Sequence, residues 1–279
     1  MKIKRHPSGN EFILVKDMWI RNFTKIGVPC IDINKTYQVS DYFTFLQNET
    51  QNSMGRYAWV DTEDFGHEKV VIISDGYDFE NKQKLISSLP KNVALIGVNQ
   101  TLKQWKNTDR SLNYYLVNNP YADCMRYLPR RNRGFPKCIA SIRTNYQFLA
   151  NYKGSVYNYC PSNEESYTNK QHDGVKYKID DCRNPICGAI QLAYHFGAEK
   201  ILLLCCDNSF NQERPGAEKL ENGLWQYPQQ DIAHSIVDGN LYWLKYMPYA
   251  EIVTKDHSSG PIYENAAYIQ EDEVLSFFN

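Results

Sequence analysis

The sequence predicts an α/β protein with a Rossmann-like, mostly parallel sheet and helices on both faces. Short apolar runs rich in β-branched residues recur from Lys69 onward, and segments with helical spacing separate them. Strands that are apolar on every residue are typical of parallel sheets, whose two faces are both covered. Strands and helices that alternate in this way form βαβ units, and right-handed crossovers between them give the Rossmann-like arrangement.

The first 66 residues do not follow this alternation. EFILVKDMWI (11–20) predicts a strand or a hairpin, and DYFTFLQNE (41–49) predicts a short helix. We therefore expect residues 1–66 to form an N-terminal appendage and residues 67–279 to form the Rossmann-like domain.

Within that domain the expected elements follow in order. Strands are predicted at 69–74, 92–99, 112–120, 137–142 and 155–159, with a helix at 81–89 and a helix or turn at 101–107. A helix at 184–197 leads into the wholly apolar strand ILLLCC (201–206), and a helix at 231–247 precedes the strand AEIVTK (250–255). The polar segment 161–174 reads as a surface excursion. A second polar segment follows ILLLCC, and because loops of that length are often lids we expect a lid at about residues 208–233.

Composition excludes some classes of protein. Lys and Arg number 31 against 32 Asp and Glu, and the net charge of −1 gives no general attraction for nucleic acid or an anionic membrane. The N-terminus lacks an apolar signal region, and no window approaches the roughly 18 apolar residues of a membrane span. We therefore expect a cytoplasmic protein. Its eight cysteines include no CxxC pair, which favours structural free thiols over zinc ligation or disulfides.

Polar residues follow four of the predicted strands. In open α/β sheets ligands bind outside the carboxyl ends of the strands, so these residues are expected to converge. Neutral amides there could bind sugar hydroxyls, base edges or phosphate oxygens. The alternative is that Asn, Asp and Gly stand there only because they form turns. The residues are Ser74, Asp75, Gly76, Asn99, Gln100, Asn118, Asn119, Pro120, Asp207 and Asn208.

Several common motifs are absent. The sequence contains no GxxxxGK[ST] P-loop, no GxGxxG fingerprint after the first strand and no DxD after a strand, so any nucleotide is held without them. His234, near the start of the helix behind the lid, is the candidate general base, because the pKa of histidine suits proton transfer near neutral pH. The alternative for His234 is a capping or surface residue.

Five short motifs occur in order over about residues 69–255: Ser74-Asp75-Gly76, Asn99-Gln100, Asn119-Pro120, Cys187-Gly188 and His234-Ser235. With them the sequence resembles the bacterial sialyltransferases that use CMP-sialic acid (glycosyltransferase family 42). The resemblance extends more distantly to motility accessory factors and archaeal hydroxymethyl-dihydropterin pyrophosphokinases. It implies that residues 67–279 are a nucleotide-binding and catalytic domain. It also implies that His234 deprotonates the acceptor hydroxyl, and that Asn99 and Asn119 hold the cytidine nucleotide with Asp75 in the place of a further asparagine.

The sequence departs from that family after Asp207. Two tyrosines that contact the leaving phosphate in the family are replaced by Ser209 and Phe210 at one place and by Glu213 and Arg214 near the other. We expect Tyr227 or Arg214 of the lid to substitute, because arginine pairs readily with phosphate. Cys187 and Gly188 take the place of the family's Ser-Gly at the start of a helix.

Three functions follow as hypotheses. The first is transfer of a sugar, sialic-acid-like under the resemblance, from a CMP-linked donor to a glycan or other hydroxyl acceptor, with no cofactor required. The second is a Mg²⁺-dependent pyrophosphokinase, with Asp75, Asp207 and Asp181 as possible suppliers of carboxylates. The third is a non-catalytic nucleotide- or glycan-binding protein.

Overall fold

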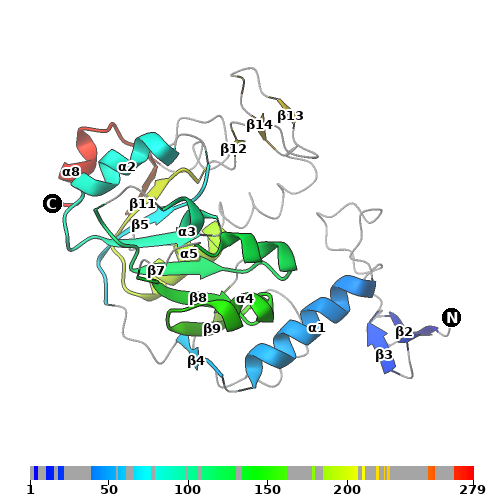
Figure 1. Ribbon diagram of the computed structural model, residues 1–279. Helices are drawn as coiled ribbons and strands as arrows, with labels where there is room; N and C mark the ends of the chain where they lie inside the picture. The colour runs from blue at the N-terminus through cyan, green and yellow to red at the C-terminus, as the bar shows by residue number, and fades with distance from the viewer. Residues whose placement is uncertain are drawn as a thin grey trace.

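The computed structural model of the chain describes residues 3–5, 11–15, 18–21, 39–54, 56–60, 66–76, 79–98, 100–105, 109–129, 134–161, 178–179, 185–206, 209–210, 218–219, 223, 225–226, 251–254 and 267–279. Its main feature is a ten-stranded sheet in the order β10-β9-β8-β7-β6-β5-β11-β15-β16, with β4 paired to β9. Every pairing in this sheet is parallel. The predicted Rossmann-like α/β class is confirmed (Figure 1).

Seven strands of this sheet lie close to their predicted positions: β5 Lys69–Ile73, β6 Ala94–Val98, β7 Tyr114–Val117, β8 Lys137–Ser141, β9 Val156–Pro161, β11 Lys200–Leu204 and β15 Glu251–Thr254. The other three are β4 Ala58–Trp59, β10 Lys178–Ile179 and β16 Ala267–Tyr268. The two-residue strands β4, β10 and β16 were not predicted, because each forms through pairing with a neighbour rather than through an apolar pattern of its own.

Helices cover both faces of the sheet. The described helices are α1 Val39–Ser53, α2 Phe79–Ser88, α3 Thr101–Gln104, the 3₁₀ helix η4 Ala122–Tyr127, α4 Tyr146–Asn151, α5 Pro185–His195 and α8 Glu273–Phe277. Alternate residues of β5 enter opposite cores: Val71 and Ile73 pack with α2, α4 and α8, whereas Val70 and Ile72 pack with α5. This period of two explains why the strand had to be apolar throughout.

The N-terminal residues contain two different parts. β1 Ile3–Arg5, β2 Glu11–Val15 and β3 Met18–Arg21 form an antiparallel sheet, in which β2 and β3 pair as a hairpin, one of the two alternatives expected for residues 11–20. The predicted short helix is the longer α1, and β4 belongs to the large sheet. Residues 39–60, inside the segment expected to be an appendage, therefore contribute a strand to the domain that follows.

The segment expected to be a lid contains a small antiparallel sheet in the order β12-β14-β13, formed by Ser209–Phe210, Trp225–Gln226 and Glu218–Lys219. The helix predicted at 231–247 lies outside the described residues. Among the described helices, none has the length and apolar character needed to cross a membrane. The six cysteines that the structure describes are free and buried, as expected, whereas Cys30 and Cys182 lie outside the described residues.

Two lysines hold the C-terminal helix α8 against the amino ends of the sheet. Lys200 donates a 2.7 Å hydrogen bond to the carbonyl of Phe277, and Lys69 donates to the carbonyl of Phe278. Cations at a helix C-terminus also interact favourably with its dipole. Each lysine is the first residue of its strand, so both contacts fix α8 at the edge opposite the predicted site.

Candidate functional site

The strand order creates one topological switch point, between β5 and β11. From β5 the chain builds β6, β7, β8 and β9 in one direction, and then returns to place β11 and β15 on the other side of β5. All these strands are parallel, so they end at one side of the sheet, which we call the carboxyl edge. Ligands of open α/β sheets bind in the crevice that such a switch opens at this edge.

Backbone hydrogen bonds join the two loops at the switch point. The Ser74 amide donates to the carbonyl of Leu204, and the Gly76 amide donates to that of Cys205, both at 3.0 Å. Asp75 between them is half-buried, and its Oδ1 lies 3.4 Å from the Ser74 hydroxyl. The predicted residues Asp75 and Gly76 therefore lie beside the end of β11, at the switch point.

Cys205 has an unusual backbone at this place. Its φ is +56°, a left-handed conformation that residues other than glycine seldom adopt, and its side chain is 0% exposed. Cys206 follows with its thiol 3.6 Å from the carbonyl of Ile72. Sequence reasoning missed Cys205, because cysteine carries no preference for positive φ that could have marked it. Strain of this kind is often found next to functional sites.

Gln100 lies at the end of β6, adjacent to β5. It is the N-cap of α3, its side chain makes no capping hydrogen bond, and its carbonyl accepts the amide of Lys103 at 3.0 Å. Thr101, the next residue, donates its hydroxyl to the carbonyl of Ile73 at 3.1 Å. This buried bond ties the start of α3 to the end of β5, and so places Gln100 one strand from Asp75.

Asn119, at the end of β7, is held inside its own loop. Its Nδ2 donates to Asp123 Oδ1 at 3.2 Å and to the Tyr127 hydroxyl at 3.0 Å, and its Oδ1 accepts the Tyr121 amide at 2.9 Å. The last bond is an Asx turn. An amide has two N–H donors, so both are engaged here, and one acceptor position on Oδ1 remains for a ligand. The predicted nucleotide contact by Asn119 thus stays a prediction.

Cys187 and Gly188 lie in the first turn of α5. Because α5 leads into the parallel strand β11, its N-terminus lies at the carboxyl edge. Both residues are buried, and Cys187 Sγ lies 3.8 Å from Gln191 Nε2. The backbone of this turn carries the positive end of the helix dipole toward the edge, whereas the thiol itself packs inward.

Half of the predicted site lies outside the described residues: Asn99, Asp207, Asn208, Arg214, Tyr227 and His234. Their expected roles stay predictions. Among the residues that are described, no group of three or more His, Cys, Asp or Glu could hold a metal ion. The other half of the predicted site lies along the carboxyl edge, at the ends of β5, β6 and β7 and at the start of α5. These residues are Asp75, Gly76, Gln100, Asn119, Cys187 and Gly188.

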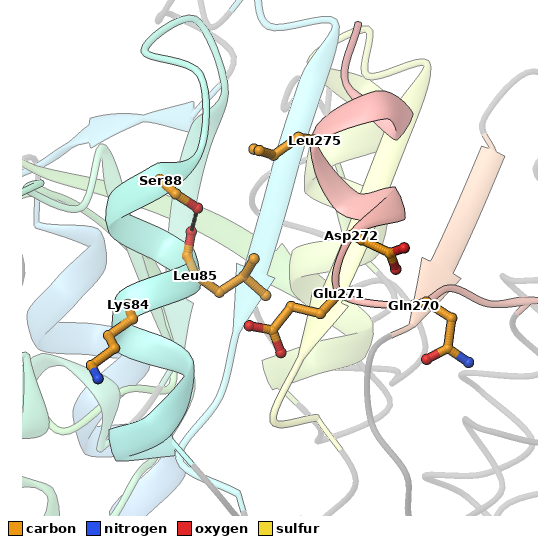
Figure 2. Close-up of a pocket in the computed structure, with 7 residues that line it drawn as sticks. All are labelled: Lys84, Leu85, Ser88, Gln270, Glu271, Asp272 and Leu275. Atoms are coloured by element: carbon orange, nitrogen blue, oxygen red, sulfur yellow. Dashed lines mark hydrogen bonds between the residues drawn. The ribbon is translucent and has the colours of Figure 1, made fainter.

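Two hollows in the described part of the molecule lie elsewhere. One, of about 570 Å³, is the groove between α2 and α8, and Figure 2 shows Leu85 and Glu271 facing each other across it. The other, of about 360 Å³, is lined by Lys69, Lys91 and their neighbours at the amino ends of β5 and β6. Neither includes a predicted site residue, so the candidate site rests on the strand order and the residues at the carboxyl edge.

Comparisons with known proteins agree with the fold. No protein-family model and no curated protein matches the sequence. A MAf glycosyltransferase from Magnetospirillum magneticum AMB-1 matches 87% of this chain with a TM-score of 0.67 and 14% identity, and the chain spans 40% of its length. The sialyltransferase CstII from Campylobacter jejuni, in complex with the substrate analogue cytidine-5'-monophosphate, matches 74% of this chain and 86% of its own, with 13% identity. Its TM-score is 0.40. At 14% identity, the likeness to the MAf glycosyltransferase shows a shared fold.

Proposed function

We propose that this chain is a glycosyltransferase-like enzyme that transfers a sugar from a nucleotide-activated donor to an acceptor hydroxyl. The observation that carries the proposal is the fold shared with a MAf glycosyltransferase over 87% of the chain. It is supported by the convergence of Asp75, Gln100 and Asn119 on adjacent strand ends beside the switch point. A CMP-linked, sialic-acid-like donor is the finer proposal, and it rests on the sequence motifs.

The reaction would be a displacement at the anomeric carbon of the donor. The acceptor oxygen forms a bond to that carbon, the carbon–oxygen bond to the nucleotide phosphate breaks, and the phosphate leaves with the electron pair. His234 would take the proton of the acceptor hydroxyl. Holding both substrates over the carboxyl edge would supply much of the acceleration, and closure of the segment at about 208–233 would exclude water that otherwise hydrolyses the donor.

Thermal unfolding with single nucleotides tests the donor class. CMP, CDP, UDP and ATP are each added with and without Mg²⁺. A ligand at 100 times its Kd stabilises by about 2.7 kcal/mol, which raises the Tm of a chain of this size by about 5 °C. We expect CMP or CDP to do so without metal. A shift with ATP only in the presence of Mg²⁺ supports the pyrophosphokinase instead, and no shift with any nucleotide contradicts both enzymatic functions.

Asp75→Asn sharpens this test. A carboxylate beside a phosphate is unfavourable unless a cation bridges them, so the variant should bind CMP more tightly than the wild type if the phosphate lies at the switch point. If Asp75 holds Mg²⁺ for a pyrophosphokinase, the same variant loses the metal-dependent shift with ATP. Asparagine and aspartate have nearly the same shape, so the variant can be compared directly with the wild-type protein.

Turnover identifies the chemistry. The protein is incubated with CMP-sialic acid and an oligosaccharide acceptor, and both the release of CMP and the mass of the acceptor are measured. We expect acceptor-dependent release and a gain of one sugar. His234→Ala should lower kcat by about 10²-fold or more if His234 is the base. Turnover at the wild-type rate in this variant removes the assignment of His234, and nucleotide binding without transfer supports the non-catalytic binding protein.

A further inference from the structure

Helix α1 places polar side chains in the interior of the protein. Asn48, Glu49 and Asn52 are only 1%, 4% and 2% exposed. Asparagine is a poor helix former, and polar groups that are buried in a fold are almost always hydrogen-bonded. Two asparagines at i and i+4 on one buried helix face therefore indicate specific contacts. Sequence reasoning assigned this segment to an appendage and gave these residues no role.

Asn52 and Glu49 hold the loop that follows β8. Asn52 Nδ2 donates to the carbonyls of Ile142 and Thr144, at 2.9 and 2.7 Å. Glu49 Oε1 accepts from Arg143 Nε at 2.6 Å. Thr144 joins the loop after β8 to β7, because its hydroxyl donates to the carbonyl of Val117 at the end of β7.

Asn48 joins that loop to the one that carries Asn119. Its Nδ2 donates to the carbonyl of Pro120 at 2.9 Å and to that of Arg143 at 3.0 Å, and its Oδ1 accepts the Tyr146 amide at 3.1 Å. One side-chain amide thus links the loop after β7, the loop after β8 and the start of α4. The Asn145 amide, which donates to the carbonyl of Asn119 at 3.0 Å, completes the junction.

We propose that Asn48 is a positioning residue of the carboxyl-edge site, and that α1 holds part of that site in place through it. This inference rests on the proposed function. The side chain of Asn119 is bonded within residues 119–127, so this loop is tied together by its own hydrogen bonds. Two described contacts of α1 reach the loop: the hydrogen bond from Asn48 to the carbonyl of Pro120, and the ring of Phe45, whose centroid lies 6.4 Å from that of Tyr121. The backbone bond from Asn145 to Asn119 joins the loop to the start of α4, and the bond from Asn48 sets the position of the loop relative to α1 and, with it, any ligand contact there.

The test compares Asn48→Asp with Asn52→Asp. Each substitution keeps the shape of the side chain, removes two N–H donors and sets a carboxylate against two backbone carbonyls. The two sites lie one helical turn apart and are equally buried, so both variants should lose similar stability in urea. The side chain of Asn52 donates to the loop after β8 and not to the loop of Asn119, and its backbone bond from Asn158 survives the substitution, which makes Asn52→Asp the matched control.

Amide hydrogen exchange gives the ligand-free measurement. We expect the amides of Tyr121 and Cys124 to exchange about tenfold faster in Asn48→Asp than in Asn52→Asp, because only the first variant breaks the hydrogen bond between α1 and this loop. Asn48→Ser and Asn52→Ser provide a milder pair if the aspartate variants do not fold, since a hydroxyl is too short to reach both carbonyls. Equal exchange in the two variants of a pair overturns the proposal.

Nucleotide affinity gives the second measurement. With CMP as the probe, we expect the Kd to rise about tenfold in the Asn48 variant and less than about twofold in the Asn52 variant, because small displacements of a binding group weaken its contacts steeply. Equal losses of affinity would mean that both asparagines act only on stability, and would overturn the role in the site. If the wild type binds none of the nucleotides tested, the proposed function fails, and the exchange measurement still decides whether Asn48 positions the loop.

Discussion

The ion pair between Glu49 and Arg143 offers a strict test of how α1 is held to the domain. Arg143 Nε lies 2.6 Å from Glu49 Oε1, and the side chains are 15% and 5% exposed. The pair lies between a helix of the predicted appendage and the loop after β8, far apart in sequence. We expect Glu49→Leu and Arg143→Met each to destabilise the protein, and the double variant to recover most of the loss.

The burial of the two charges sets the magnitude. Two unit charges about 4 Å apart attract by about 4 kcal/mol at an effective dielectric constant of about 20. Removal of one partner leaves the other charge buried, which typically costs about 3–5 kcal/mol, whereas an apolar pair in its place is often close to neutral. Because Arg143 keeps some access to water, we expect about 3 kcal/mol for each single variant and about 1–2 kcal/mol for the double variant.

Urea unfolding measures the three free energies. With a slope of about 2 kcal/mol per molar, each single variant should lower the midpoint by about 1.5 M, and the double variant by less than 1 M. Fluorescence and far-ultraviolet circular dichroism are followed together, and the slope should not change. The backbone carbonyl of Arg143 still accepts from Asn48 in every variant, so this hydrogen bond between α1 and the loop after β8 is kept throughout the cycle. If the losses of the two single variants sum to the loss of the double variant within about 0.5 kcal/mol, the reasoning is refuted.

Three further outcomes are expected. Burial raises the pKa of Cys124 to about 12 and that of Tyr115 well above 10, so these groups lose their protons at lower pH in the unfolded chain than in the folded one. The free energy of unfolding should therefore be highest below about pH 9 and fall above it by about 1.4 kcal/mol per group and pH unit. Tyr115→Phe should flatten that fall above pH 10 in unfolding titrations. Lys200→Met should cost about 1–2 kcal/mol and speed amide exchange in residues 273–278, because its bond to the end of α8 is lost. Cys205→Gly should leave stability within about 1 kcal/mol of wild type, since relief of the positive φ offsets the lost packing, whereas Cys206→Gly should cost about 2–3 kcal/mol by calorimetry.

Much of the fold could be predicted because burial on both faces leaves a direct mark on a strand. KVVII of β5 and KILLL of β11 are apolar from their second residue to their last, and both lie in the middle of the sheet. β4 could not be found in this way, because Ala58–Trp59 is a strand only through its pairing with β9. α1 runs to Ser53, beyond the predicted end at Glu49, and the amide of Asn52 in this last part has partners on another loop that the sequence does not reveal.

The candidate site was predictable in position and less so in detail. Asp75 and Gln100 stand at strand ends, as parallel topology requires. Asn119 does too, but its amide is engaged by its own loop, which is the turn-forming alternative that the sequence left open. The sequence could not reveal the positive φ of Cys205 or the contacts of Asn48, because both depend on chain segments that meet only after folding.

If a nucleotide binds at the carboxyl edge, as proposed, the electrostatics of that edge favour one orientation. The distance from the end of β5 to the end of β7 is two strand spacings, or about 10 Å, which is the scale of a nucleoside monophosphate. α5 packs against β5, β6 and β7 and brings the positive end of its dipole to this edge, so a phosphate is best placed near its first turn. Asp75 disfavours the phosphate on its own side, and the loop of Asn119 offers an acceptor rather than donors. An amino group of a base is an N–H donor that such an acceptor can bind, so we expect the base to lie toward β7. If so, Asn119→Ala, which removes the acceptor, should remove the preference for cytosine over uracil.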